Sequence, residues 1–186
     1  LTPIAMDHMS YLGDSLAAIA AEKAAIMKRG APCISAEQRA DAAAVIEDRA
    51  SSIGVDVALQ DRDWTIEDDP FGTVRYADSE TEWSVPRPRL AGPHQISNLG
   101  VALATLARLP FAFPSFGLRT GMRQVEWPGR CQNLTSGPLT RGLAAGWELW
   151  LDGGHNPLAG EALAAWLADE TTVTVVALWS KRSNTV

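Results

Sequence analysis

Residues 151–157, LDGGHNP, gather several groups that could bind an anionic ligand. Asp152 ends an apolar run, and His155 stands just before a helical pattern of apolar residues. Open α/β sheets bind ligands at the carboxyl ends of their strands, and helix N-termini offer free N–H groups that suit phosphate. The carboxylate of Asp152 could also accept hydrogen bonds from ribose hydroxyls. The alternative is that the glycines and the asparagine only shape a tight turn, and motif chemistry leaves both interpretations open.

A second group, residues 7–26, places a histidine after a strand end and a lysine on an Ala-rich helix. Taken singly, His8 is typical of a hydrogen-bonded structural residue, and Lys23 of a solvated partner of Glu22. Together they allow another role. A lysine in a poorly solvated place has a lowered pKa, and its neutral amine can take up carbon dioxide as a carbamate. The carbamate is an oxygen-rich metal ligand beside an imidazole.

Two further residues could contact a nucleotide. Asn98, in GPHQISN (92–98), offers a donor and an acceptor that match an adenine edge, although an Asn near a helix start is ordinarily a cap. Arg130, in EWPGR (126–130), could grip a phosphate with both guanidinium N–H groups, or form a structural ion pair.

The elements that must position these residues follow an α/β pattern. Strands and helices alternate near the beginning and near the end of the chain. Between them, residues 55–90 form short runs in which polar and apolar residues mix, which suits an antiparallel extension with one solvent-exposed face. Strands are predicted at 1–6, 31–36, 147–152 and 172–179. Helices are predicted at 15–29 (capped by Ser15 and Gly30), 36–54 and 157–170. Two more are predicted, one within 92–109 after a loop ending near Asn98, and a short one between the PFAFPSFG (110–117) and VEWPGRCQ (125–132) segments.

The composition excludes some classes of partner. The net charge is −6 and the basic residues are scattered, which argues against nucleic acid or an anionic membrane. No apolar run approaches a membrane span, and we expect a cytoplasmic protein whose cysteines, Cys33 and Cys131, are reduced thiols. Because the sequence opens on Leu1 in an apolar run, we also expect the chain to begin inside a larger protein.

The four segments occur in this order in one family. The chain resembles folylpolyglutamate synthase and dihydrofolate synthase, members of the Mur-ligase superfamily of ATP-dependent amide-forming ligases. The resemblance rests on LDHxxxLGxxxxxIAxEKAxIxKxGxP at 6–32 (with Met6 where Leu is common), GPHQxxN at 92–98, WPGR at 127–130 and LDGGHNP at 151–157.

This resemblance implies a fold and a domain division. Residues 1–129 would form the C-terminal portion of a central ATP-binding domain, a mostly parallel sheet with an antiparallel extension. Residues 130–186 would begin a Rossmann-like C-terminal ligase domain that the chain does not complete.

The resemblance also implies roles for single residues. His8 looks like the family's magnesium-binding histidine, and Lys23 like the catalytic lysine that carries a carbamate and orients the metal or the reacting phosphoryl group. His155, the other catalytic candidate, would approach the phosphates of ATP. The remaining nucleotide contacts would come from Asn98 toward the base, Arg130 toward the phosphates and Asp152 toward the ribose.

The implied reaction is phosphoryl transfer from ATP to a carboxylate, followed by attack of an amine on the acyl phosphate. In the family, with ATP and Mg²⁺ as cofactors, the carboxylate belongs to dihydropteroate or a folate and the amine to L-glutamate. Magnesium neutralises charge that builds up on the phosphoryl oxygens.

The chain departs from the family pattern in one large respect. It contains no G-x-x-x-x-G-K-[ST] phosphate loop, so we expect a middle-to-late part of a ligase that is inactive alone. Two other functions remain open. One is a non-catalytic nucleotide-binding or interaction module that needs a partner chain, and the other is a different Mur-type ligase acting on a peptide.

Overall fold

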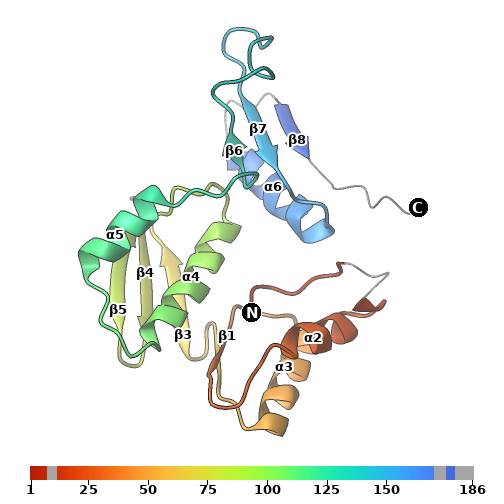
Figure 1. The fold of residues 1–186 in the computed structure, drawn as a ribbon, viewed down its shortest axis with the longest axis vertical. Coiled ribbons are helices and arrows are strands. Elements are labelled where there is room, and N and C mark those ends of the chain that lie inside the picture. The colour runs from red at the N-terminus through yellow and green to blue at the C-terminus, as the bar shows by residue number, and fades with distance from the viewer. Residues whose placement is uncertain (8–11, 170–174, 179–186) are drawn as a thin grey trace. The chain divides into compact units, whose positions relative to one another are not determined.

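A computed structural model describes residues 1–7, 12–169 and 175–178 (Figure 1). The chain divides into two compact units: one comprises Leu1–Pro88 and His94–Gln124, the other Arg89–Pro93 and the residues from Val125 onward. The chain passes from the first unit into the second for the last time between Gln124 and Val125, a few residues before the domain boundary predicted at residue 129. The predicted α/β class is confirmed, since helices alternate with strands that pair both parallel and antiparallel.

The first unit is layered around a parallel strand pair. Strands β1 (Cys33–Ser35) and β2 (Val57–Leu59) pair with Cys33 opposite Val57. Because successive side chains of a strand point to opposite faces, Cys33 joins the core formed with α2 and α3, whereas Ile34 joins the core formed with α4. The strands are therefore covered on both faces, as in doubly wound α/β proteins.

The helices of this unit are α2 (Leu16–Ala24), α3 (Ala40–Ile53), α4 (His94–Ala107) and α5 (Ser115–Gln124). Ser15 caps α2 as predicted, its hydroxyl accepting the Ala18 N–H at 3.2 Å. The predicted end of this helix near Gly30 is wrong. Ile26 and Met27 bond to carbonyls only three residues back, so the chain tightens into turns after Ala24.

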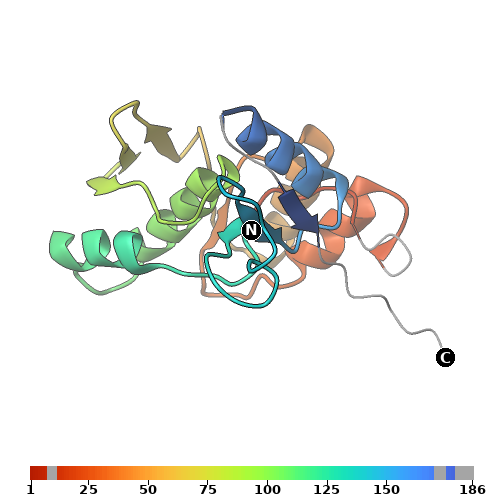
Figure 2. The ribbon, with the colours of Figure 1, turned by 90° about the horizontal axis from the view of Figure 1, so that it is seen from above.

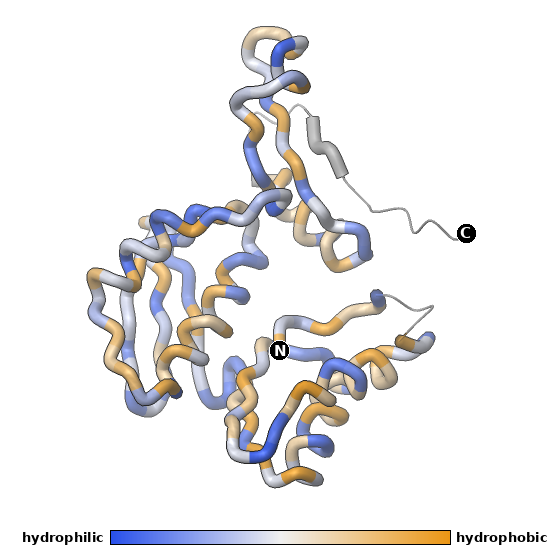
Figure 3. The backbone as a smooth tube through the Cα atoms, in the orientation of Figure 1, coloured by the Kyte–Doolittle hydropathy of each residue, from blue (hydrophilic) through white to orange (hydrophobic). Residues whose placement is uncertain are grey.

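The sequence predicts an antiparallel extension over residues 55–90, but Val57–Leu59 instead pair parallel to β1. The extension is an antiparallel meander that begins at Trp64 and completes the first unit. It consists of β3 (Trp64–Asp68), β4 (Thr73–Asp78) and β5 (Glu82–Pro86). Helix α4 covers one face of this sheet (Figure 1), and Trp64, Tyr76 and Leu103 are fully buried between them. The tube through α2 is mostly apolar, whereas α3 alternates between apolar and polar residues, as expected for a helix with one wet face (Figure 3).

The strand predicted at residues 1–6 is absent. Leu1 alone makes the bonds of a parallel neighbour of β1: its amino group donates to the Ile34 carbonyl, and its own carbonyl accepts the Ala36 N–H at 2.9 Å. The pairing stops there because Pro3 has no N–H to donate. The next N–H, that of Ile4, donates to the Gln38 side chain at 2.9 Å.

The second unit is built on β7 (Leu149–Asp152), which lies between β6 (Gln132–Asn133) and β8 (Val175–Leu178). β7 and β8 are parallel, and α6 (Pro157–Asp169) connects them and lies along one face of the sheet (Figure 2). Its small core holds Cys131, Leu163 and Trp166, with the ring of Trp166 edge-on to Trp150 at 4.7 Å between centroids. The sequence predicts this strand–helix–strand unit correctly. No helix in the described part of the chain has the length and apolar character that crossing a membrane requires.

Candidate functional site

Asp152 ends β7 and lies 5% exposed, at the point where the chain turns toward α6. One carboxylate oxygen accepts the N–H of Gly154 at 2.6 Å, within its own turn. The other accepts the N–H of Cys131 at 2.8 Å, from a segment 21 residues earlier in the chain. The carboxylate predicted to face a ribose is therefore turned inward and joins two backbone segments.

The turn after Asp152 leads directly into the N-terminus of α6. Asn156 caps the helix, because its side-chain oxygen accepts the Ala159 N–H at 2.8 Å, and Pro157 follows as the first helical residue. His155 is exposed, and its Nδ1 lies 3.0 Å from the carbonyl oxygen of Gly153. The imidazole is thus held at the start of a helix, whose free N–H groups and positive dipole end favour an anion.

The segment that carries Arg130 lies against this turn. The Gly153 N–H donates to the Gly129 carbonyl at 2.8 Å, and the Gly129 N–H donates to the Gln132 side chain at 3.0 Å. Arg130 itself is exposed, and a Cβ added at Gly153 would lie 3.9 Å from its Nη1 atom. The guanidinium group and the turn are therefore close neighbours.

Cys131 is the residue of this site that the sequence did not reveal. Its φ is +40°, a conformation that residues other than glycine rarely adopt, and its side chain is 4% exposed. Burial, together with the negative charge of Asp152 beside it, raises the pKa of the Cys131 thiol to about 12, against the opposing charge of Arg130. The thiol is therefore protonated and structural. Its position directly after Arg130 is the one signal in the sequence that could have pointed to it.

Asn98 lies in the first unit, on the second turn of α4. The helix begins at His94, so the prediction of a loop reaching Asn98 is wrong, and Asn98 is not a cap. Its side-chain N–H donates to the oxygen of the buried Gln95 at 3.1 Å, and the Gln95 amide nitrogen lies 2.9 Å from Nε2 of His94. These contacts orient the half-buried carboxamide of Asn98, the group that was predicted to contact the adenine base, one turn after the start of α4.

Lys23 lies in the last turn of α2 with its side chain exposed. The poorly solvated setting predicted for it is not found, because the apolar residues of α2 face α3 and leave Lys23 on the outer side. It lines an open cavity of about 700 Å³ that it shares with Lys28 and Glu22. The predicted metal ligand His8 lies outside the described residues. Among those described, no three His, Cys, Asp or Glu residues are grouped to hold a metal ion.

The structure thus gathers Arg130, Asp152 and His155 within the second unit, whereas Lys23 and Asn98 belong to the first. Within the second unit, an open cavity of about 410 Å³ is lined by Arg130 and Cys131 together with the exposed Trp127. The roles that the sequence assigns to these residues stay predictions.

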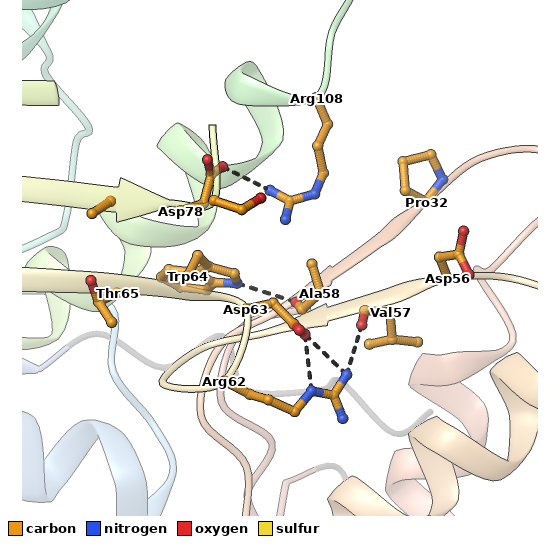
Figure 4. Close-up of a pocket in the computed structure, with 12 residues that line it drawn as sticks. Pro32, Asp56, Val57, Ala58, Arg62, Asp63, Trp64, Thr65, Asp78 and Arg108 are labelled. Atoms are coloured by element: carbon orange, nitrogen blue, oxygen red, sulfur yellow. Dashed lines mark hydrogen bonds and ion pairs between the residues drawn. The ribbon is translucent and has the colours of Figure 1, made fainter. Parts of the chain in front are cut away.

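Another open cavity, of about 690 Å³, lies in the first unit and contains none of the predicted residues (Figure 4). Pro32 and Asp56, which immediately precede β1 and β2, place it at the amino ends of the parallel strands. Each guanidinium group in it already faces a carboxylate: Arg62 lies 3.0 Å from Asp63, and Arg108 lies 3.7 Å from Asp78. Because parallel sheets bind ligands at the carboxyl ends of their strands, this cavity is a poor candidate for the nucleotide.

Comparison with known proteins points to one group of enzymes. The chain is 29% identical over 168 residues to a folylpolyglutamate synthase of Lacticaseibacillus casei, a match that covers 84% of this chain and 36% of that protein. It is 30% identical over 193 residues to the mitochondrial folylpolyglutamate synthase of Homo sapiens, with 89% of this chain and 29% of that protein covered. The chain therefore spans about a third of the length of these relatives. No family model matches.

Solved structures of the same enzymes share the fold. One named as an FPGS-AMPPCP-folate complex aligns with a TM-score of 0.73 at 27% identity, covering 90% of this chain and 40% of that one. A second, named as a bifunctional folylpolyglutamate synthase/dihydrofolate synthase with Mn, AMPPNP and L-glutamate bound, aligns with a TM-score of 0.72 at 26% identity, over 89% and 37% of the two chains. The resemblance found in the sequence motifs is confirmed.

Proposed function

This chain is a relative of the folylpolyglutamate synthases, and we propose that it forms part of the nucleotide site of an ATP-dependent ligase that joins L-glutamate to a folate or to dihydropteroate. The observation that carries the proposal is the junction in the second unit, where the loop bearing Arg130 is bonded to the turn that leads into α6. A cation and the N-terminus of a helix there flank the same turn.

This junction suits the phosphates of ATP. A guanidinium group binds phosphate oxygens through two parallel N–H bonds, and the first N–H groups of a helix add further donors. His155, at the entry to α6, would be a third donor toward the same oxygens. In a ligase these groups would hold the phosphoryl group while a carboxylate, which is a poor electrophile, is converted into an acyl phosphate that an amine can attack.

The remaining assignments rest on the resemblance. Asn98 would face the adenine base, and Lys23, as a carbamate, would orient the reacting phosphoryl group. Mg²⁺ is proposed as the metal because the resemblance assigns His8 to it, and a solved relative is named with Mn bound. The described residues do not provide a metal site by themselves. We propose a cytoplasmic enzyme that acts on small molecules, with neither nucleic acid nor a membrane as partner.

Two measurements test the function. The first is calorimetric titration of the purified chain with AMPPCP, which should show saturable binding that Arg130→Ala weakens by about tenfold or more, as expected for a lost bond to a charged group. Glu161→Gln, at an exposed position of α6, is the matched control and should bind like the parent. Absence of AMPPCP binding would contradict the nucleotide site.

The second measurement addresses the reaction. A hybrid in which this chain replaces the matching segment of the Lacticaseibacillus casei enzyme should release ADP only when L-glutamate and a pterin substrate are both present. Comparing a folate with dihydropteroate identifies the acceptor. A folded hybrid that binds AMPPCP but releases no ADP with either acceptor would instead favour a non-catalytic nucleotide-binding module, and ADP release with a peptide acceptor would favour a different Mur-type ligase.

A further inference from the structure

Asp152 connects two segments that are far apart in sequence. Its side chain is 5% exposed, one oxygen accepts the N–H of Gly154, and the other accepts the N–H of Cys131. Hydrogen bonds in which the acceptor is ionised are roughly twice as strong as neutral ones. These two bonds use about half of the acceptor positions of the carboxylate.

The glycines of the turn permit this arrangement. A Cβ at Gly154 would lie 2.8 Å from the Asp152 Oδ1 atom and 2.7 Å from the Cβ of Ala159, so only glycine lets the N–H approach the carboxylate this closely. The Gly153 N–H donates to the Gly129 carbonyl at 2.8 Å, which adds a second connection between the same two segments.

The loop on the other side of the connection is strained where it meets Asp152. Cys131 has a φ of +40°, and a residue other than glycine keeps such a conformation only where its surroundings enforce it. The bond from its N–H to Asp152 is one such constraint. Because this N–H belongs to the peptide group that joins Arg130 to Cys131, the same bond fixes the backbone from which the Arg130 side chain projects.

We propose that Asp152 is a positioning residue, whose carboxylate holds the 127–131 loop against the 152–156 turn and thereby places Arg130 beside the N-terminus of α6. The inference rests on the proposed function, because it takes Arg130 to be the group that binds phosphate. This role is separate from any contact with ribose, because Asp152 acts through Arg130.

The first test needs no nucleotide. In Asp152→Asn one acceptor oxygen becomes an N–H donor that faces a backbone N–H, so one of the two bonds is lost. We expect the amide NMR signals of Cys131 and Gly154 and the Nε–H signal of Arg130 to shift, with Glu161→Gln leaving them in place. Iodoacetamide should modify Cys131 about tenfold faster or more, because local opening exposes the buried thiol. Cys33, buried in the first unit, is the internal reference.

The second test separates positioning from ribose contact. The affinities of the parent, Asp152→Asn, Arg130→Ala and the double variant are measured for AMPPCP and for adenosine. If Asp152 acts through Arg130, Asp152→Asn weakens AMPPCP binding several-fold more than adenosine binding, and this extra loss disappears once Arg130 is gone. Equal losses for adenosine and AMPPCP, additive with Arg130→Ala, would show that Asp152 acts independently of Arg130 and would overturn the proposal.

The outcomes keep the two proposals distinguishable. If the parent binds no AMPPCP, the nucleotide site is wrong, while the NMR and labelling results still decide whether Asp152 places Arg130. Unchanged Arg130 and Cys131 signals in Asp152→Asn would refute the positioning role. So would loss of all α6 signals, because Asp152 would then support the whole unit and not this loop.

Discussion

The ring of Trp64 occupies the space beside Gly100 where a side chain would otherwise begin: a Cβ at Gly100 would lie 2.7 Å from the Trp64 Cζ3 atom. Trp64 is 1% exposed, and its indole N–H donates to the Ala58 carbonyl at 3.2 Å, which holds the ring in place. The glycine in α4 thus lets the helix approach β3 closely, and this contact joins α4 to the meander.

Gly100→Ala should therefore destabilise the first unit even though alanine is the better helix former. Overpacking of this kind costs about 1–3 kcal/mol. Gly121→Ala, in α5, is the matched control because nothing lies within 4 Å of its added Cβ. It should be neutral or stabilise by up to about 1 kcal/mol. Urea unfolding followed by tryptophan fluorescence measures both, and equal effects of the two substitutions would contradict the close approach.

Tyr76→Phe should lower stability in a pH-dependent way. The Tyr76 hydroxyl donates to Asp78 at 2.6 Å. Burial alone would raise the pKa of the Asp78 carboxyl, but the bonds from Tyr76, Glu80 and Thr81 and the charge of Arg108 together outweigh it and lower that pKa. The depressed pKa contributes stability above the unfolded-state value, near 3.8, and this contribution is lost as pH falls through the folded-state pKa.

We accordingly expect Tyr76→Phe to cost about 1 kcal/mol at pH 7 and distinctly less at a pH below the folded-state pKa of Asp78, where this carboxyl is protonated. Urea unfolding of the parent and the variant across this range measures the difference. An NMR titration should show the pKa of Asp78 rising in the variant. A destabilisation that is the same at both pH values would mean that the hydroxyl does not act through the carboxylate.

Lys23→Ala should abolish ADP release in the hybrid ligase, and added bicarbonate should not restore it, because no amine remains to carry a carbamate. Lys28→Ala is the matched control, since both lysines are exposed and line the same cavity. It should leave turnover close to that of the hybrid. Near-normal turnover in Lys23→Ala would refute the carbamate proposal.

The purified chain of 186 residues should release no ADP in the presence of ATP, a folate and L-glutamate. These residues contain no phosphate loop of the G-x-x-x-x-G-K-[ST] type to cradle the transferred group. A coupled assay for ADP checks this, with the hybrid ligase as the positive control. Glutamate-dependent turnover by the chain alone would show that Arg130 and the α6 N-terminus suffice for phosphoryl transfer.

Much of the architecture was predictable because it depends on signals a few residues apart. Ser15 begins α2 and Gly54, with a φ of +64°, ends α3, since both act on the backbone of their own helix. The strand–helix–strand unit around α6 also follows from local periodicity. The end of α2 and the start of α4 were misplaced, because turns after Ala24 and the GPH segment before Asn98 carry no unambiguous boundary signal.

The sequence by itself determined the α/β class, most of the order of the elements and the resemblance to folylpolyglutamate synthase, because apolar periodicity, capping residues and motif order are all readable along one chain. Only the tertiary structure decided that the Asp152 carboxylate turns inward to Cys131, that Cys131 adopts a positive φ, and that Lys23 is exposed. Each of these depends on how segments distant in sequence pack together. A hydrogen bond across 21 residues leaves no pattern that spacing could reveal.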